Sequence, residues 1–246
     1  MKIKGSDLVF IILFSLLIGF LGGIYASSLY LQKQETKVSV QLIDGERIVT
    51  TQLPAIDTRG NGVVGLLRTT VKPGNGGISV DVNVLSYFDT QQSARIAADV
   101  ARNYTGIDTS NLDINYAIEV NATAVEGTSA GAAMTVSVIA ALQNKTLNNS
   151  MMITGTIEED GIVGEVGAII AKARAAKENG ATLFLVPEGQ ASSFELKRNK
   201  ECRKIGFIDY CEVKYTQQKV SVEEIAGIDV MEVKNIDDVV KVMVVE

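Results

Sequence analysis

The sequence has no histidine among its 246 residues. This absence excludes every Ser-His-Asp and Cys-His catalytic mechanism and every His-ligated metal site. A serine nucleophile in this chain must therefore take its base from a lysine, a carboxylate or the N-terminal amine. Long basic runs are also missing, because none exceeds the pair Arg203-Lys204, and the net charge is −6. Nucleic-acid binding, which needs a basic patch, is therefore disfavoured.

The sequence also lacks the motif Gly-x-x-x-x-Gly-Lys-Ser/Thr, internal repeats and low-complexity stretches. Without that motif the chain has no P-loop of its own, and we expect it to act without ATP and without a cofactor or metal. Its hydrophobic fraction of 46% and charged fraction of 21% are sufficient for a globular core. The length fits one domain of ordinary size together with an anchor.

Cysteine occurs only twice, at Cys202 and Cys211, with Gly206 between them where the chain could turn. Outside the cytoplasm, an even pair at this spacing indicates a disulfide that closes a short loop. The alternative is that the two residues are unrelated buried thiols. The spacing alone does not separate these interpretations.

An apolar run extends from residue 8 to residue 26 and continues to residue 31. A run of about 18 or more apolar residues is long enough to span a bilayer as a helix. A secretory signal has a shorter apolar region, of about 7–15 residues, although Ala26 would suit a cleavage site. A buried soluble helix would normally show a polar face, which this segment lacks. We therefore expect a retained transmembrane anchor at residues 8–31, with a cleaved signal as the alternative.

Lysines flank this run, with Lys2 and Lys4 before it and Lys33 and Lys37 after it. The positive-inside rule favours a cytoplasmic N-terminus at residues 1–7 and a body outside the cytoplasm. We expect residues 32–50 to form a tether that leads into a first strand, and residues 51–246 to form one catalytic domain. The expected location is the cell membrane, crossed once.

Hydrophobic periodicity beyond residue 50 predicts an α/β (α+β) domain with a mixed sheet and packed helices. The first part looks antiparallel, because turn signals at residues 59–62 and 73–77 separate apolar runs, and the second of these leads into an alternating strand, expected in a hairpin. The predicted strands are residues 78–84, 114–120, 152–157 and 183–186, and the predicted helices are residues 90–104, 129–142, 168–179 and 236–243.

Ser129 stands at a junction between a strand, a loop and a helix, where residues 127–131 read Gly-Thr-Ser-Ala-Gly. The unpaired backbone N–H groups and the positive end of a helix suit an oxyanion that develops during acyl transfer. Small residues after the serine leave room for a substrate backbone. The alternative is structural, because serine is a favoured N-cap and small residues allow helices to pack closely.

Lys172 lies on the apolar stripe of its predicted helix, since Ala168, Ile169, Ala175 and Ala176 are its neighbours at helical spacing. A lysine on a buried face is unusual unless it is paired or functional. Burial lowers the pKa of an amine, which a general base acting on a serine hydroxyl requires. The alternative is a lysine whose stem packs while its ammonium reaches water.

Residues 127–134 read Gly-Thr-Ser-Ala-Gly-Ala-Ala-Met, which closely resembles the catalytic signature of Lon-type peptidases. Ser129 and Lys172 are 43 positions apart, which is similar to the separation of that family's Ser/Lys dyad. Residues 153–157 and 161–167 also resemble family motifs. The resemblance covers about residues 55–190 well and the C-terminal part loosely.

The resemblance implies a Lon-type proteolytic domain, a serine endopeptidase that hydrolyses unfolded or flexible polypeptides and commonly assembles as a homo-oligomeric ring. It implies that Ser129 is the nucleophile, that Lys172 is the general base, and that Thr154 hydrogen-bonds the lysine. The backbone at Thr128, Ser129 and Ala130 would hold the oxyanion.

Three positions depart from the common pattern, because Glu126 stands where Asp is usual, Thr128 where Pro is usual and Thr156 where Glu is usual. These departures resemble the membrane-tethered relatives that lack an ATPase, and we expect Glu126 to have a supporting role.

Two other functions remain open on the sequence. A catalytically idle module could present the same groove for peptide binding. The fold also resembles small-molecule kinases that hold phosphate at a Gly/Ser-rich helix start. Such kinases need ATP, which a domain outside the cytoplasm would not meet. The presence of Ser129, Lys172 and Thr154 argues against an idle module.

Overall fold

The computed structural model describes residues 45–83, 88–121 and 127–245. All described residues belong to one compact unit. Within the described ranges no helix is long and apolar enough to cross a membrane. The expected anchor at residues 8–31 lies outside them.

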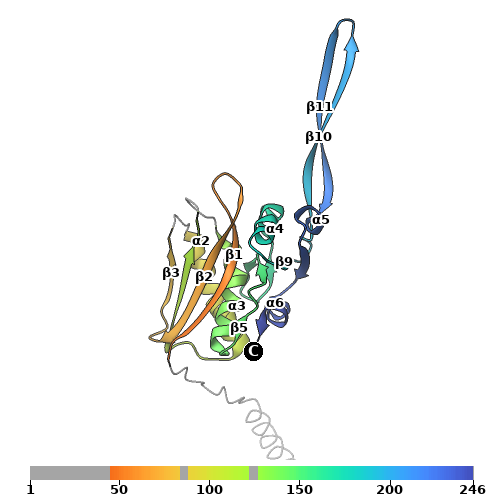
Figure 1. Cartoon of the computed structure of the whole chain (residues 1–246). Helices are drawn as coiled ribbons and strands as arrows, with labels where there is room; N and C mark the ends of the chain where they lie inside the picture. The colour runs from red at the N-terminus through yellow and green to blue at the C-terminus, as the bar shows by residue number, and fades with distance from the viewer. Residues whose placement is uncertain (1–44, 84–87, 122–126, 246) are drawn as a thin grey trace, which may run out of the picture. The chain divides into compact units, whose positions relative to one another are not determined.

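A four-stranded sheet forms the first part of the domain (Figure 1). Its strands are β1 (Arg47–Ile56), β2 (Gly62–Pro73), β3 (Ile78–Val82) and β4 (Leu112–Glu119), in the order β1-β2-β4-β3. Strands β1, β2 and β4 pair antiparallel, whereas β3 pairs parallel to β4. Alternate side chains of β4, including Ile114, Tyr116 and Ile118, are buried in the core.

The predicted strand at residues 78–84 is confirmed over residues 78–82, but the expected hairpin with the preceding strand is wrong. β4 lies between β2 and β3, so these two strands do not pair. The turn at residues 73–77 is stabilised instead by Asp113 of β4, whose carboxylate accepts hydrogen bonds from the backbone N–H groups of Asn75 and Gly77 at 2.9 and 2.8 Å. These two bonds hold the pKa of Asp113 below its usual value.

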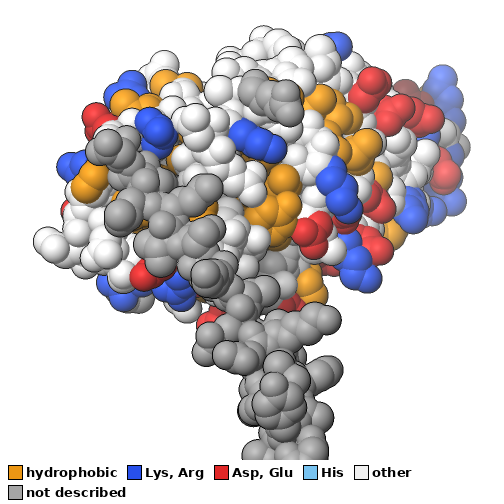
Figure 2. Space-filling view, turned by 90° about the horizontal axis from the view of Figure 1, so that it is seen from below, with side chains coloured by type: hydrophobic (Ala, Val, Ile, Leu, Met, Phe, Trp, Pro, Cys, Tyr) orange, Lys and Arg blue, Asp and Glu red, His pale blue; other side chains and the backbone are white. Residues whose placement is uncertain are grey.

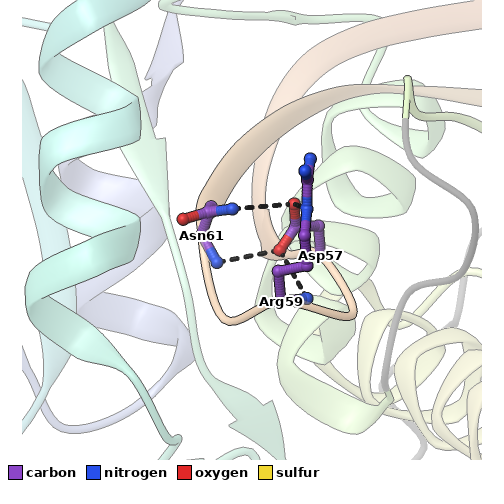
Figure 3. Close-up of polar contacts among 3 residues, drawn as sticks. All are labelled: Asp57, Arg59 and Asn61. Carbon is purple, nitrogen blue, oxygen red and sulfur yellow. Dashed lines mark hydrogen bonds and ion pairs between the residues drawn. The ribbon is translucent and has the colours of Figure 1, made fainter.

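The turn between β1 and β2 is held by the carboxylate of Asp57 (Figure 3). It accepts hydrogen bonds from the backbone N–H groups of Arg59 and Asn61 at 2.9 and 2.8 Å and from the Asn61 amide at 3.1 Å. The bonds from Asn61 are the main reason that the pKa of Asp57 lies below its ordinary value. Gly60 has a φ of 82°, as the predicted turn requires.

Three predicted helices are confirmed, α2 (Phe88–Thr105) and α3 (Gly131–Leu142) beside this sheet and α6 (Ile236–Met243) against α3. Every residue of α3 is buried, because the helix packs against β1 and β2 and also contacts α2 and α6. Its run of small and aliphatic side chains therefore forms the centre of the domain. The predicted N-cap Asn235 of α6 accepts a hydrogen bond from the backbone N–H of Asp238 at 3.2 Å.

A second, parallel sheet has the order β12-β9-β6 and is formed by β6 (Met151–Ile153), β9 (Leu183–Pro187) and β12 (Asp229–Val233). Helices α4 (Ile169–Glu178) and α5 (Val222–Ala226) accompany this sheet, and their apolar residues share a separate core with Phe184 and Val186. The remaining small elements are η1 (Thr128–Ala130) and the pairs β5 (Thr146–Leu147) with β13 (Val244–Val245) and β7 (Thr156–Ile157) with β8 (Val163–Gly164).

An exposed antiparallel hairpin, β10 (Ser192–Ile205) and β11 (Ile208–Ser221), extends from the domain next to α5 (Figure 1). The sequence predicts only a short loop around Gly206. In the structure Cys202 and Cys211 stand opposite each other across the two strands, and a disulfide joins them with 4.0 Å between their Cα atoms.

On the face in Figure 2, basic, acidic and hydrophobic side chains are intermixed. Neither sign of charge forms a continuous surface on the described part of that face. The domain is α+β, with a mixed four-stranded sheet and a smaller parallel sheet, and the predicted site takes Ser129 from the start of α3 and Lys172 from α4.

Candidate active site

Ser129 is half-buried in η1, the short 3-10 turn that leads directly into the buried helix α3. Gly127 begins this turn with a φ of 73°, and a Cβ at that position would lie 3.1 Å from Oδ2 of Asp89. The positive φ favours glycine at position 127, and a larger residue would also press on the Asp89 carboxylate. The first N–H groups of a helix have no partner inside the helix, so Thr128, Ser129 and Ala130 carry the backbone donors closest to the serine hydroxyl.

The chain between β6 and β7 fixes the backbone at Ser129. The N–H of Gly155 donates to the carbonyl of Ser129 at 3.0 Å, and the N–H of Ala132 donates to the carbonyl of Gly155 at 3.1 Å. A Cβ at Gly131 would lie 2.8 Å from the backbone nitrogen of Ile157, so this close approach also needs glycine. The start of α3 is therefore held in one position by a segment 25 residues further along the chain.

Lys172 is 4% exposed and lies on the buried side of α4. Its Nζ donates a hydrogen bond to Oγ1 of Thr154 at 3.3 Å, and that hydroxyl donates to the carbonyl of Ser129 at 3.4 Å. Burial lowers the pKa of Lys172 to about 8. A buried amine with no carboxylate partner in the described residues is thus connected to the serine backbone through one hydroxyl.

Ser129 and Lys172 line the same groove, which has a volume of about 330 Å³. The groove is lined by Ile56, Asp89, Gly127, Thr128, Ser129, Thr156, Glu165, Val166, Gly167, Ala168 and Lys172. Among the hydrogen bonds of the described residues, none joins Oγ of Ser129 to Nζ of Lys172. Catalytic hydrogen bonds are often long before substrate binds, so a shared groove is the arrangement that matters here.

A narrower, largely apolar pocket of about 20 Å³ shares Gly127 and Ser129 with this groove. It is lined by Leu53, Pro54, Ala55, Val82, Thr90, Ile118, Val120, Gly127, Ser129 and Ala130. A larger hollow of about 450 Å³ lies along β2 and β4, but neither Ser129 nor Lys172 lines it. The chemistry therefore belongs to the smaller groove and its apolar neighbour.

Gly62 allows α4 to come close to β2, and this close contact helps to place Lys172 in the groove. A Cβ at Gly62 would collide with the backbone carbonyl of Ala171, which directly precedes the lysine. β2 can therefore contact α4 only because this strand begins with glycine. In the sequence Gly62 indicates only a turn, so its role in packing cannot be predicted from the local pattern.

Gln190 holds Val166, which lines the groove, and the sequence pattern does not predict this role. Its side-chain amide accepts a hydrogen bond from the N–H of Val166 at 3.0 Å and donates one to the carbonyl of Val166 at 2.9 Å. Two residues later Ala168 has a φ of 55°, a left-handed conformation that costs free energy for a residue other than glycine. The Gln190 bonds therefore hold a strained segment at the start of the lysine helix. The only signal for Gln190 in the sequence is its place after the buried strand and Pro187.

The other predicted site residues are not all in this groove. Glu126 lies outside the described residues. Cys202 and Cys211 are in the exposed hairpin and do not line the groove. Within the described residues no group of His, Cys, Asp or Glu could hold a metal ion.

The hydroxyl of Thr154 can be removed with little change in shape, which gives a direct prediction. Thr154→Val should lower kcat for peptide cleavage by about 10-fold to 100-fold, because Lys172 loses the acceptor that orients its amine. KM should change little. Steady-state kinetics should show Thr154→Ser within a few-fold of the parent, since serine keeps the hydroxyl. Equal kcat for the valine and threonine proteins would mean that Thr154 does not orient the lysine.

The chain was compared with known protein families and curated proteins. Residues 54–209 match the Lon protease (S16) C-terminal proteolytic domain. The chain is 37% identical to the Archaeal Lon protease of Thermoplasma volcanium over 89 residues, 36% of this chain and 14% of the relative. It is 30% identical to the Lon protease of Fervidobacterium nodosum over 161 residues, 63% of this chain and 19% of the relative.

The alignments thus span less than a fifth of the length of these relatives. The family match nevertheless covers more than half of this chain and includes both Ser129 and Lys172. The chain therefore belongs to the family of the Lon protease (S16) C-terminal proteolytic domain, a family of serine-type endopeptidase domains.

Proposed function

We propose that this protein is a membrane-anchored serine endopeptidase that hydrolyses peptide bonds without ATP, with Ser129 as nucleophile and Lys172 as general base. The observation that carries the proposal is the buried amine of Lys172 in the same groove as Ser129, with both residues inside the range that matches a serine-peptidase family.

The lowered pKa of Lys172 supports its role as a base. With a pKa of about 8, roughly a tenth of the amines are neutral at pH 7. At the ordinary lysine value near 10.5 the neutral fraction would be roughly 0.03%. Because burial is the cause of the shift, the apolar neighbours of the lysine supply about a 300-fold gain in competent base at neutral pH.

Acylation follows from this arrangement. The neutral amine of Lys172 takes the proton from Oγ of Ser129 while the oxygen attacks the scissile carbonyl carbon. The negative charge that forms on the carbonyl oxygen meets backbone N–H groups at the start of η1 and α3. The C–N bond then breaks, and the ammonium of Lys172 gives its proton to the departing amine. Thr154 accepts a hydrogen bond from the lysine throughout.

Deacylation repeats these steps with water. Lys172, neutral again, takes a proton from a water molecule that attacks the acyl carbon, and the ester bond to Ser129 breaks as its oxygen regains the proton. The apolar pocket beside Ser129 has a volume of only about 20 Å³, so it would accept no more than a small group of the substrate. Because the chain belongs to a family of proteolytic domains, we expect unfolded or flexible polypeptides as substrates.

Cleavage of an unstructured peptide should need no nucleotide, because the sequence contains no P-loop motif. The rate for a fluorogenic peptide should be the same, within about two-fold, with and without ATP and Mg²⁺. The purified protein and its Ser129→Ala variant serve as the pair. Strict dependence on ATP in the purified protein would contradict this part of the proposal.

The body should lie outside the cytoplasm, held by residues 8–31. Protease added to intact cells should then degrade it, and non-reducing mass spectrometry should find Cys202 and Cys211 joined, two hydrogens lighter than the reduced pair. On the chain-entropy model a loop this short contributes roughly 2–3 kcal/mol. Protection in intact cells together with free thiols would mean that the orientation is reversed.

A further inference from the structure

The β10–β11 hairpin is a surface that the proposed peptidase activity does not use. Each of its strands has 14 residues, which corresponds to a length of about 46 Å at 3.3 Å per residue. Almost all of its described side chains are exposed. A two-stranded hairpin alone is marginally stable in water, and here a disulfide joins the strands near the tip. An arm of this length, stabilised in this way, needs a partner to cover it.

The register of the hairpin divides its side chains between two faces. Arg198 stands opposite Tyr215 and Lys200 opposite Val213, so these four side chains share one face with the disulfide. We call this the cationic face: the even-numbered residues of β10 from 194 to 204 and the odd-numbered residues of β11 from 209 to 219. The opposite face carries the remaining residues.

Each acid on the opposite face has an ion-pair partner, and Glu195 pairs with Arg174 of α4 at 3.9 Å. Lys214 forms ion pairs with Glu201 and Glu212 at 3.8 and 3.4 Å. The guanidinium of Arg203 lies over the ring of Tyr210, 5.3 Å from its centre. This face has three cations and three acids, so it has no net charge and needs no partner.

The cationic face differs from the opposite face because it has a net positive charge and its charged groups form no ion pairs with described residues. It carries four cations, Arg198, Lys200, Lys204 and Lys219, against the single acid Asp209. None of these five forms an ion pair with another described residue.

Apolar side chains lie between these cations. Phe194 and Leu196 are each 67% exposed, and Tyr215 is 63% exposed. A row of exposed apolar groups among unpaired cations is typical of a docking surface for an acidic partner.

We infer that the cationic face docks onto the acidic body of a second copy of this chain. The hairpin, residues 192–221, has seven Lys or Arg and four Asp or Glu, whereas the rest of the chain has 16 and 25. Each copy therefore carries a positive arm and a negative body. The cationic face spans 11 residues of each strand, a length of about 36 Å, so at a width of about 10 Å it covers roughly 360 Å². In a dimer in which each copy donates its arm and receives the other's, each copy therefore buries roughly 700 Å², which lies within the range of about 600–1,000 Å² per partner of a stable complex.

Paired charge reversals test this inference in the full chain in detergent. Arg198→Glu with Lys200→Glu changes the cationic face, and Lys197→Glu with Arg203→Glu makes the same change of charge on the opposite face. Mass measured by light scattering should show that the wild-type chain self-associates. The first pair should weaken the dissociation constant at least about 10-fold, and the control pair by less than about 3-fold.

A fluorescent reporter identifies what covers the face, because the chain has no tryptophan. Emission from a Tyr215→Trp reporter should shift to shorter wavelength as protein concentration rises, whereas emission from a Tyr210→Trp reporter on the opposite face should not. Three results would overturn the inference: a monomer at all concentrations, equal effects of the two charge reversals, or quenching of the Tyr215→Trp reporter by brominated anionic lipids without self-association. The last would make the face a lipid-binding surface.

Discussion

Ser129→Ala should have no measurable peptidase activity, with kcat reduced by about 10⁴-fold or more, because the attacking oxygen is lost and no other group can replace it. The fold should remain intact. The η1 turn has no side-chain capping hydrogen bond, so the serine hydroxyl supports no helix end. We expect the free energy of unfolding to change by less than about 1 kcal/mol.

Thermal unfolding and a fluorogenic peptide assay measure these two effects separately. Ser110→Ala is the matched control, since Ser110 is exposed and does not line the groove. Substantial activity in a pure, folded Ser129→Ala protein would remove the serine mechanism from this groove.

Lys172→Arg should be as inactive as Lys172→Ala, although arginine keeps the positive charge. A guanidinium does not lose its proton in proteins, so it cannot accept one from the serine hydroxyl. Both variants should lower kcat by about 10³-fold or more, because nucleophile and base act as one unit. Active Lys172→Arg protein would mean that Lys172 is not the base.

The pH dependence follows from the pKa of the lysine. Because burial lowers this pKa to about 8, kcat/KM of the parent should rise with pH through an ionisation near 8 and then level off. An ionisation near the ordinary lysine value would mean that the burial of Lys172 is lost in solution.

Lys172→Met should be at least as stable as the parent, because it removes a charge from an apolar site. The pKa of Lys172 is lower in the folded than in the unfolded state, so folding releases protons from it between the two values. The parent should therefore gain stability as pH rises from about 8 towards 10.5, by roughly 2–3 kcal/mol, and the methionine variant should lack this gain. Denaturant unfolding at several pH values measures the difference.

The sequence predicted the elements with strong local signals. The sequence predicts α3 after the Gly-Thr-Ser-Ala-Gly junction, α4 by the apolar stripe around Lys172, and α6 by the cap residue Asn235. The burial of Lys172 was predicted for the same reason, because its neighbours at helical spacing are apolar. Local pattern decides these features, so they can be inferred without tertiary structure.

The sequence pattern does not indicate which strands pair when they are far apart along the chain. β4 lies between β2 and β3, and nothing in residues 62–82 indicates that a later strand separates them. β10 and β11 were missed because exposed strands carry charged side chains on both faces, so no apolar alternation marks them. The hydrogen bonds of Gln190 with Val166 join segments 24 residues apart and likewise have no local pattern.

The central claim is that Lys172 activates Ser129, and phosphonate labelling tests it most directly. A fluorophosphonate probe should modify only the peptide that contains Ser129, as mapped by mass spectrometry, and the labelling rate should rise through an ionisation near pH 8. Lys172→Met should lose most of this labelling while remaining folded. Labelling at another residue, or labelling of Ser129 at the same rate in Lys172→Met, would contradict the account.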